Sequence, residues 1–166
     1  ELDILAVPVN LGATLYANTD GGVMLLAAST LGVLYIVERG DTVESFADLA
    51  GRTVYATGKG TTPEYALTYL LAQNGLTLGE DVTVEWKSEP TEVVAQMAQE
   101  EGAVAMLPQP YVTAAGVQLG EGFHVALSIS EEWEKLGGGS LCTTACILAR
   151  TEFVESHPQA VEAFLK

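Results

Sequence analysis

Basic residues are scarce in this sequence. Its 166 residues include 7 Lys and Arg against 22 Asp and Glu, and the formal net charge is -15 at pH 7. Nucleic acids are therefore not expected as partners, because binding to phosphates requires a basic surface. Direct contact with an anionic membrane surface is disfavoured for the same reason. We interpret the acidity as a source of solubility.

Cysteine, histidine and long apolar runs are also scarce. Cys142 and Cys146 are the only cysteines, and on one strand they would lie roughly 13 Å apart, too far for a disulfide. We expect two buried thiols, and structural roles for His124 and His157. No residues have the spacing of a metal site, so neither metal nor cofactor is expected. No apolar run reaches the roughly 20 residues of a membrane span, and the 48% hydrophobic content is typical of a globular chain.

The sequence also lacks familiar nucleotide-binding and catalytic motifs. Gly58-Lys59-Gly60-Thr61 does not have the spacing of a P-loop, and Pro63 stands where the dinucleotide fingerprint needs its third glycine. A hydrolase needs a nucleophile beside a base, and Ser140 has no nucleophile-elbow motif around it. We therefore do not expect an enzyme.

The most informative stretch present is 53–65. Val54 and Tyr55 favour a buried strand, and Gly58 and Gly60 allow a sharp turn that a ligand can approach closely. Thr62 is predicted as the N-cap of a helix, with Pro63 at its first position. A helix N-terminus with unpaired N–H groups suits a small polar or anionic molecule.

The rest of the chain alternates between strand and helix patterns. This order predicts an α/β fold with largely parallel sheets. The expected strands are 3–7, 23–28, 32–37, 53–56, 81–86, 103–107, 125–129 and 141–149, and the expected helices are 10–17, 45–49, 63–74, 92–101, 111–115 and 152–166 with an interruption near 157–158.

Two parts of the chain match at an offset of 100 residues. Residues 3–11 and 103–111 each contain an apolar strand, a proline at its end and a following helix, and 23–27 falls opposite 123–127. Residues 52–102 precede the second copy, and the first copy has no counterpart to them. We therefore expect a longer protein with an N-terminal segment of similar length, and two lobes whose strand ends face one cleft.

Several stretches resemble solute-binding proteins of ABC importers, in the NMT1/THI5-like branch for nitrate, taurine, sulfonates and thiamine-precursor pyrimidines. The resemblance is carried by 3–8, 48–55 with the glycine turn, and 152–165, and the family's first strand and first ligand loop have no match. It implies a type II periplasmic-binding-protein-like bilobed fold with one lobe incomplete. It further implies a monomer that is extracytoplasmic, periplasmic or a cell-surface lipoprotein, and that delivers a small-molecule solute to an ABC permease.

The expected division is 1–33 as the remainder of the first lobe, 34–128 as the second lobe, and 129–166 as a crossover strand with C-terminal helices. The candidate ligand-binding residues are Asn10, Thr30, Thr57, Gly58, Lys59, Gly60, Thr61, Thr62, Gln109 and Tyr111. Lys59 either attracts an anionic group or points to solvent, and Tyr65, Trp86 and Tyr111 either stack on a flat ligand or belong to the core.

Two other functions remain open on the same scaffold. One is an enzyme acting on a pyrimidine-like or acyl substrate, although 142–146 is a poor match to the cysteine-rich motif of the pyrimidine-synthase relatives. The other is a ligand-sensing domain of a signalling protein.

Overall fold

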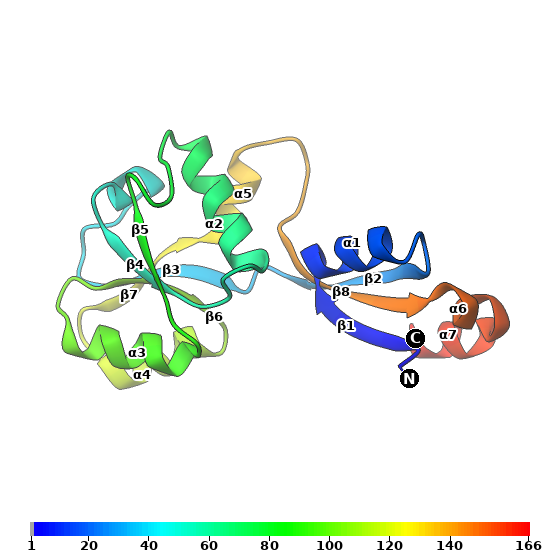
Figure 1. Cartoon of the computed structure of the whole chain (residues 1–166). Coiled ribbons are helices and arrows are strands. Elements are labelled where there is room, and N and C mark those ends of the chain that lie inside the picture. The colour runs from blue at the N-terminus through cyan, green and yellow to red at the C-terminus, as the bar shows by residue number, and fades with distance from the viewer. Residues whose placement is uncertain (1) are drawn as a thin grey trace. The chain divides into compact units, whose positions relative to one another are not determined.

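The computed structural model describes residues 2–166, which form two compact units (Figure 1). Unit 1 contains the residues up to Leu31 together with Thr143–Lys166, and unit 2 contains Gly32–Cys142. The structure thus groups the last strand and the C-terminal helices with the N-terminal residues. The division at 33/34 and 128/129 stays a prediction about the lobes of the complete protein.

Unit 1 contains a three-stranded sheet in the order β1-β8-β2, in which β8 is antiparallel to both neighbours. Its small core joins Val7, Val23, Cys146 and Leu148 to Val9 and Leu15 of helix α1. The elements are β1 (Ile4–Pro8), α1 (Val9–Asn18), β2 (Val23–Leu31), β8 (Thr143–Arg150), α6 (Thr151–Ser156) and α7 (Pro158–Phe164).

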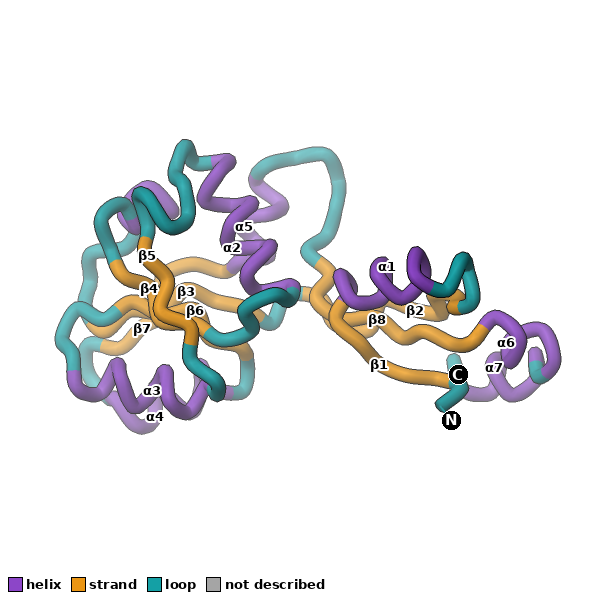
Figure 2. The backbone as a smooth tube through the Cα atoms, viewed as in Figure 1, coloured by secondary structure: helices purple, strands orange, loops and turns teal. Residues whose placement is uncertain are grey.

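Unit 2 contains a five-stranded sheet in the order β5-β4-β6-β3-β7, with helices on both faces (Figure 2). Its elements are β3 (Leu34–Arg39), a short 3-10 helix η1 (Phe46–Leu49), β4 (Thr53–Ala56), α2 (Thr62–Gln73), β5 (Thr83–Trp86), α3 (Pro90–Gln99), β6 (Val104–Pro108), α4 (Tyr111–Leu119), β7 (Phe123–Ser128) and α5 (Ile129–Lys135).

Alternate residues of the central strands β3, β4 and β6 enter different cores. On β6, Val104 and Met106 pack with the leucines of α2, whereas Ala105 and Leu107 pack with α3 and α4. Because helices cover both faces, the central strand β6 is buried on both sides, and this explains its nearly continuous apolar sequence.

The prediction of largely parallel sheets is wrong. Among the strands of residues 2–166, only β4–β5 and β4–β6 are parallel pairs, and the pairs made by β3 and β8 are antiparallel. Within each unit, strands joined through an α-helix do run in one direction, as expected for crossover connections. However, β3 follows β2 directly and β8 follows a glycine-rich loop, and each is inserted against the direction of its neighbours. A pattern of alternating elements does not show where such a strand inserts.

The internal repeat is confirmed in three dimensions. β1 and β6 occupy positions 4–8 and 104–108, and each is followed by a helix and a strand, α1 with β2 and α4 with β7. In both units an antiparallel strand lies between the two repeated strands, β8 in unit 1 and β3 in unit 2. The repeated unit is therefore a β-α-β motif opened by an inserted strand.

Helix α2 forms because Ala66, Leu67, Leu70 and Leu71 place one apolar face against the sheet, where all four are buried. Its predicted start is wrong by one residue, because the N-cap is Thr61 and Thr62 is already helical. The Thr61 hydroxyl donates to the carbonyl of Gly58, which holds Thr61 in an extended conformation. Pro63 is then the second helical residue, where its missing N–H is still harmless.

Helix α5 was not expected from the sequence. It is short, and its residues include Glu131, Glu132 and Glu134, so it lacks a long apolar period. Its start is nevertheless built normally, since the hydroxyl of Ser128 accepts a hydrogen bond from the N–H of Glu131. The only local signal was this serine followed by acidic residues.

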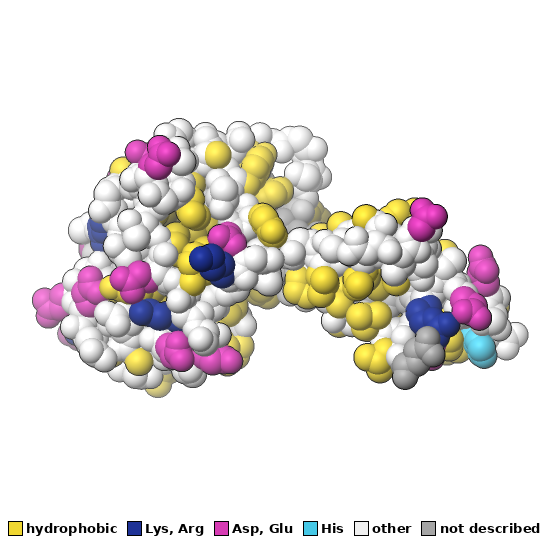
Figure 3. Space-filling view, viewed as in Figure 1, with side chains coloured by type: hydrophobic (Ala, Val, Ile, Leu, Met, Phe, Trp, Pro, Cys, Tyr) yellow, Lys and Arg dark blue, Asp and Glu magenta, His cyan; other side chains and the backbone are white. Residues whose placement is uncertain are grey.

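The two cysteines are free and buried, as predicted. Burial raises the pKa of both thiols, which makes them poor nucleophiles. Among residues 2–166, no helix has the length and apolar character needed to cross a membrane. On the face drawn in Figure 3, acidic side chains are spread over both units and basic ones are few.

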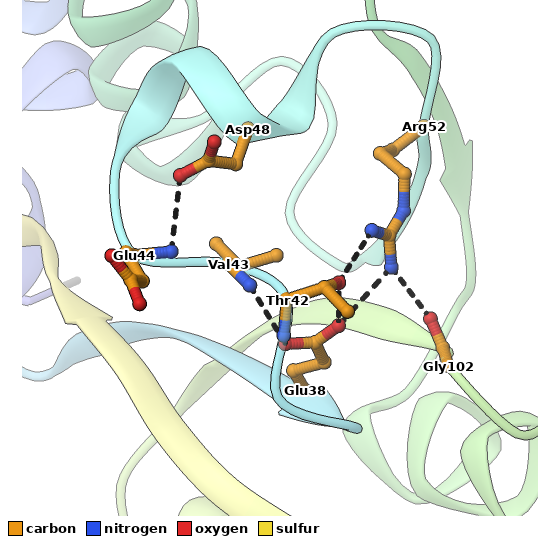
Figure 4. A network of polar contacts seen from close by, with 7 residues as sticks. All are labelled: Glu38, Thr42, Val43, Glu44, Asp48, Arg52 and Gly102. Carbon is orange, nitrogen blue, oxygen red and sulfur yellow. Dashed lines mark hydrogen bonds and ion pairs between the residues drawn. The ribbon is translucent and has the colours of Figure 1, made fainter.

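A buried carboxylate anchors the end of β3 in unit 2 (Figure 4). The side chain of Glu38 is fully buried and accepts hydrogen bonds from the N–H groups of Thr42 and Val43, at 2.8 and 3.0 Å, and from the Thr42 hydroxyl. Arg52 approaches the same carboxylate at 3.3 Å and donates to the carbonyl of Gly102 at 2.8 Å. These contacts tie β3 to the loop before η1 and to the starts of β4 and β6.

Removing this carboxylate should destabilise the protein. We expect Glu38→Ala to lower the free energy of unfolding by about 3 kcal/mol, because Arg52 and the N–H groups of Thr42 and Val43 lose their acceptor. Glu44→Ala is the matched control, since Glu44 is exposed on the same loop, and should change stability by less than about 0.5 kcal/mol. Urea unfolding of both variants tests this, and equal losses would show that the Glu38 contacts are dispensable.

The same residue should make stability depend on pH. Burial raises the pKa of Glu38, but hydrogen bonds from Thr42 and Val43 and the contact with Arg52 outweigh burial and lower it below its ordinary value of 4.5. The unfolded chain therefore takes up this proton first, so the stabilisation is complete above pH 4.5 and is lost as the pH falls through the folded-state pKa. We expect Glu38→Gln to flatten the fall in unfolding free energy below pH 4.5, and an unchanged slope would contradict this assignment.

Candidate functional site

The candidate site lies at one edge of the sheet of unit 2. β4 and β6 are adjacent and parallel, with Ala56 opposite Met106, so their carboxyl ends meet at the same edge. The turn between β4 and α2, residues 57–61, follows one end, and Gln109 follows the other. The structure therefore brings together the predicted residues Thr57, Gly58, Lys59, Gly60, Thr61, Thr62, Gln109 and Tyr111 at this edge.

The β4–α2 turn is held by its own hydrogen bonds. Gly58 and Gly60 have positive φ angles of 85° and 78°, which favour glycine. The carbonyl of Gly58 accepts from both the N–H and the hydroxyl of Thr61, at 3.0 and 2.6 Å. The turn is thus shaped before any ligand arrives.

A carboxylate of the chain itself contacts this turn. Glu64, in the first turn of α2, accepts a hydrogen bond of 2.5 Å from the N–H of Gly60. A carboxylate near a helix N-terminus is stabilised there without any ligand. An anionic ligand that used the Gly60 amide would have to displace Glu64, whereas a neutral polar group could bind beside it. Lys59 is exposed at the same turn.

Gln109 and Tyr111 have different surroundings at the neighbouring strand end. Gln109 is exposed, and its side-chain oxygen accepts from the Thr113 hydroxyl at 3.0 Å, while its backbone N–H donates to the carbonyl of Val33 at 2.9 Å. Tyr111 is half-buried and packs against the core beneath α3 and α4. Gln109 can therefore offer a side-chain amide to a ligand, and Tyr111 serves mainly as packing.

Two predicted residues belong to unit 1. Asn10 is half-buried in the first turn of α1, where its carbonyl accepts from the Thr14 hydroxyl. Thr30 lies on β2, and its carbonyl accepts from the Thr144 hydroxyl at 3.3 Å. Their place in a common site with the turn of unit 2 stays a prediction.

Sequence reasoning missed one polar group at this edge, Ser130. β7 pairs with β3 through Ser128 and Tyr35, so Ser130, two residues further on, lies near the same edge as Gln109. The Ser130 hydroxyl is buried and has no hydrogen-bond partner among residues 2–166. Gly32 has a positive φ of 64°, and a Cβ there would lie 2.7 Å from this hydroxyl, so both the backbone conformation and the available space favour glycine. The sequence signal that could have identified Ser130 is a serine placed just after the end of a strand.

Two pockets of unit 1 contain none of the predicted ligand-binding residues, and one of them, of about 330 Å³, is lined by polar side chains that include Arg150, Glu152 and His157. Residues 2–166 contain no cluster of His, Cys, Asp and Glu that could hold a metal ion. A pocket of about 370 Å³ in unit 1 is lined by Val9, Gly12, Tyr16, Val23 and Cys146 among other residues, and no charged side chain or predicted ligand-binding residue lines it. Tyr55, which donates to Glu100 at 2.6 Å, has its pKa raised to about 12 and acts as a structural contact.

Comparison with known sequences gives one family. The sequence model described as NMT1/THI5 like matches residues 23–166. No relative was found among curated protein sequences.

Solved structures show the same fold. The periplasmic aliphatic sulphonate binding protein SsuA from Escherichia coli is similar over 99% of this chain, with a TM-score of 0.71 and 18% identity. The alkanesulfonate-binding protein SsuA from Xanthomonas axonopodis pv. citri, bound to MOPS, is similar over 98% of this chain, with a TM-score of 0.62 and 20% identity. A putative periplasmic sulfonate-binding protein SsuA from Methylobacillus flagellatus KT is similar over 96% of this chain, with a TM-score of 0.68 and 21% identity. The chain covers 53%, 53% and 46% of these structures, so it spans about half their length.

The two glycines of the turn should respond differently to substitution. Gly60→Ala should lower the unfolding free energy by about 1 kcal/mol, because its positive φ is strained for alanine but no atom lies near the new Cβ. Gly58→Ala should cost roughly twice as much, since its Cβ would lie 2.9 Å from the Thr61 hydroxyl and 3.0 Å from Pro63. Denaturant titrations of both variants measure this, and equal losses would show that the turn is not packed as described.

Proposed function

The chain belongs to the NMT1/THI5-like family, and on this premise we propose that it is part of the solute-binding component of an ABC importer. The complete protein captures a small polar or anionic organic solute and delivers it to a membrane permease. Similarity to sulfonate-binding and other transport-associated binding proteins supports this role.

One observation carries the proposal most directly. The glycine turn before α2 and Gln109 lie at adjacent carboxyl ends of parallel strands, which is where open α/β sheets bind ligands. The turn offers the hydroxyls of Thr61 and Thr62 and a backbone made accessible by two glycines. Such a site binds through directed hydrogen bonds to a polar group of the solute.

The charges at the turn bear on the kind of solute. Glu64 already accepts from Gly60, so an anionic head group would gain Lys59 and the helix N-terminus but would have to displace a carboxylate. A neutral polar group avoids that exchange. Both kinds of solute therefore remain within the proposal, and Glu64 is the residue that distinguishes them.

The proposal extends to the complete protein. A second lobe, which includes unit 1, supplies Asn10 and Thr30 to the solute, and binding favours the closed form by differential affinity. The closed form is then recognised by the permease. We place the protein outside the cytoplasm, in the periplasm or as a cell-surface lipoprotein, and as a monomer.

A non-catalytic role fits the titratable groups better than an enzyme does. Both thiols are buried with raised pKa values, and Ser140 accepts from the indole N–H of Trp133 at 3.0 Å. His157 and Ser156 do line an open pocket of about 330 Å³ in unit 1, but the Ser156 hydroxyl lies 2.6 Å from the backbone carbonyl of Glu152, to which it donates. The carboxylates of the same pocket, Asp3 and Glu152, pair with Arg150.

Two hydroxyls provide the test of this site. The solute that co-purifies with the complete protein is first identified by native mass spectrometry. Thr61→Ala combined with Thr62→Ala should then weaken its binding by about tenfold, which corresponds to the loss of one good hydrogen bond. Calorimetry measures the affinity.

Thr68→Ala is the matched control, because Thr68 is exposed further along α2 and its hydroxyl donates only within the helix, to the carbonyl of Glu64. It should leave the affinity unchanged. If the double variant keeps the unfolding temperature of the control and binds the solute as tightly, the turn is not part of the binding site.

A further inference from the structure

The apolar pocket of unit 1 lies between helix α1 and the sheet, and α1, β2 and β8 all line it (Figure 1). Its volume is about 370 Å³, and no charged side chain lines it. Tyr16 and Leu25, which also line it, are 60% and 63% exposed and form an open rim. The buried residues that form its floor are Gly12, Val23, Cys146 and Leu148.

The internal repeat identifies the positions of unit 2 that match this floor. At the offset of 100 residues, Gly12 matches Val112, which is 4% exposed in the core between α3, α4 and the sheet. Val23 matches Phe123, whose ring packs against that core. The Phe123 ring lies 3.5 Å from the place of a Cβ on Gly116 of α4. Both floor positions of unit 1 therefore carry a smaller side chain than their matches.

Strand β8 adds a third difference of the same kind. β8 matches β3, because each lies between the two repeated strands of its sheet. Cys146 pairs with Val7. Tyr35 pairs with Leu107, which the offset matches to Val7. Cys146 thus takes the place of a tyrosine that packs against the core of unit 2, and a thiol fills much less space than that ring.

One change in the opposite direction does not fill the pocket. Tyr16 matches Gly116, but the Tyr16 side chain is 60% exposed at the rim. The floor is also constrained by close packing, because a Cβ on Gly12 would lie 3.0 Å from the sulfur of Cys146. A side chain at position 12 would therefore press on β8. Glycine is unfavourable inside a helix, so this close approach gives a reason for its presence.

We propose that this pocket binds a small, uncharged aromatic molecule. The matching positions of unit 2 hold the rings of Phe123 and Tyr35, so the repeat indicates a ring as the group that fits against α1. The volume of about 370 Å³ falls within the roughly 300–1,000 Å³ of small-molecule sites.

The absence of charge from the lining argues for an uncharged ligand. A charged molecule would lose its hydration on entering the pocket and gain no ionic partner there. Burial also raises the pKa of Cys146, so its thiol is uncharged at neutral pH. This site contains none of the predicted solute-binding residues, and the proposal does not depend on the proposed function.

Titration of the complete protein with toluene, the side-chain analogue of phenylalanine, is the first test. We expect a Kd on the order of 1 mM, as suits a ligand with so few atoms. The methyl NMR signals of Val112, in the filled core of unit 2, should not move. The signals that should shift to saturation are those of Val9, Val23, Leu25 and Leu148. If no signal shifts to saturation, or if both units respond alike, the proposal is overturned.

Benzoate is the matched control ligand, because it adds a negative charge to the same ring. It should affect the methyl signals of the pocket at concentrations at least tenfold higher than toluene does, since no cation lines the pocket. Equal affinity for the two compounds at these methyl groups would contradict the assignment of an uncharged ligand.

A variant that fills the pocket provides the second test. Val23→Phe gives unit 1 the side chain that Phe123 gives unit 2, and it should weaken toluene binding at least tenfold. Val117→Phe is the matched control, because Val117 is 84% exposed on α4, and it should leave the affinity unchanged. If both variants bind toluene equally well, the ring binds elsewhere. The titration of the unmodified protein decides the matter even if Val23→Phe does not fold.

Discussion

Each of the two sheets depends on the backbone hydrogen bonds of one inserted strand, β8 in unit 1 and β3 in unit 2. β3 joins β6 to β7 and β8 joins β1 to β2, each running against neighbours that are themselves linked through a helix. One end of β3 is fixed by the buried carboxylate of Glu38, which is tolerated because Thr42, Val43 and Arg52 satisfy it. At the opposite end of β3, the backbone carbonyl of Val33, the residue before the strand, accepts a hydrogen bond from the backbone N–H of Gln109 at the candidate site. β3 therefore links the buried contacts of Glu38 to the edge of the sheet that carries the candidate site.

The candidate site combines a rigid framework with one exchangeable contact. The turn before α2 is shaped by two glycines and by Thr61, so little ordering is needed when a ligand binds. The contact from Glu64 to Gly60 is local and exposed, and a ligand can replace it at modest cost. Such a balance fits the proposed solute-binding role, which requires both binding and release of the solute.

Much of the fold could be predicted from local sequence patterns, whereas the pairing of strands far apart in the sequence could not. The glycines of 53–65, the apolar face of α2 and the repeat at 100 residues all depend on short patterns, and the structure contains each of them. The insertion of β3 and β8 depends on contacts far apart in sequence, and α5 has no long apolar period. The Glu64 contact and the unpaired Ser130 hydroxyl depend on where the side chains lie in the folded structure. The sequence of residue types alone does not determine these positions.

A crystal structure of the complete protein with the solute that co-purifies with it is the most direct test of the central claim, that the edge formed by β4 and β6 binds the solute. The account predicts solute atoms within hydrogen-bonding distance of the turn at 57–62 and of the Gln109 side chain. A solute that is bound elsewhere and contacts neither of them would contradict it.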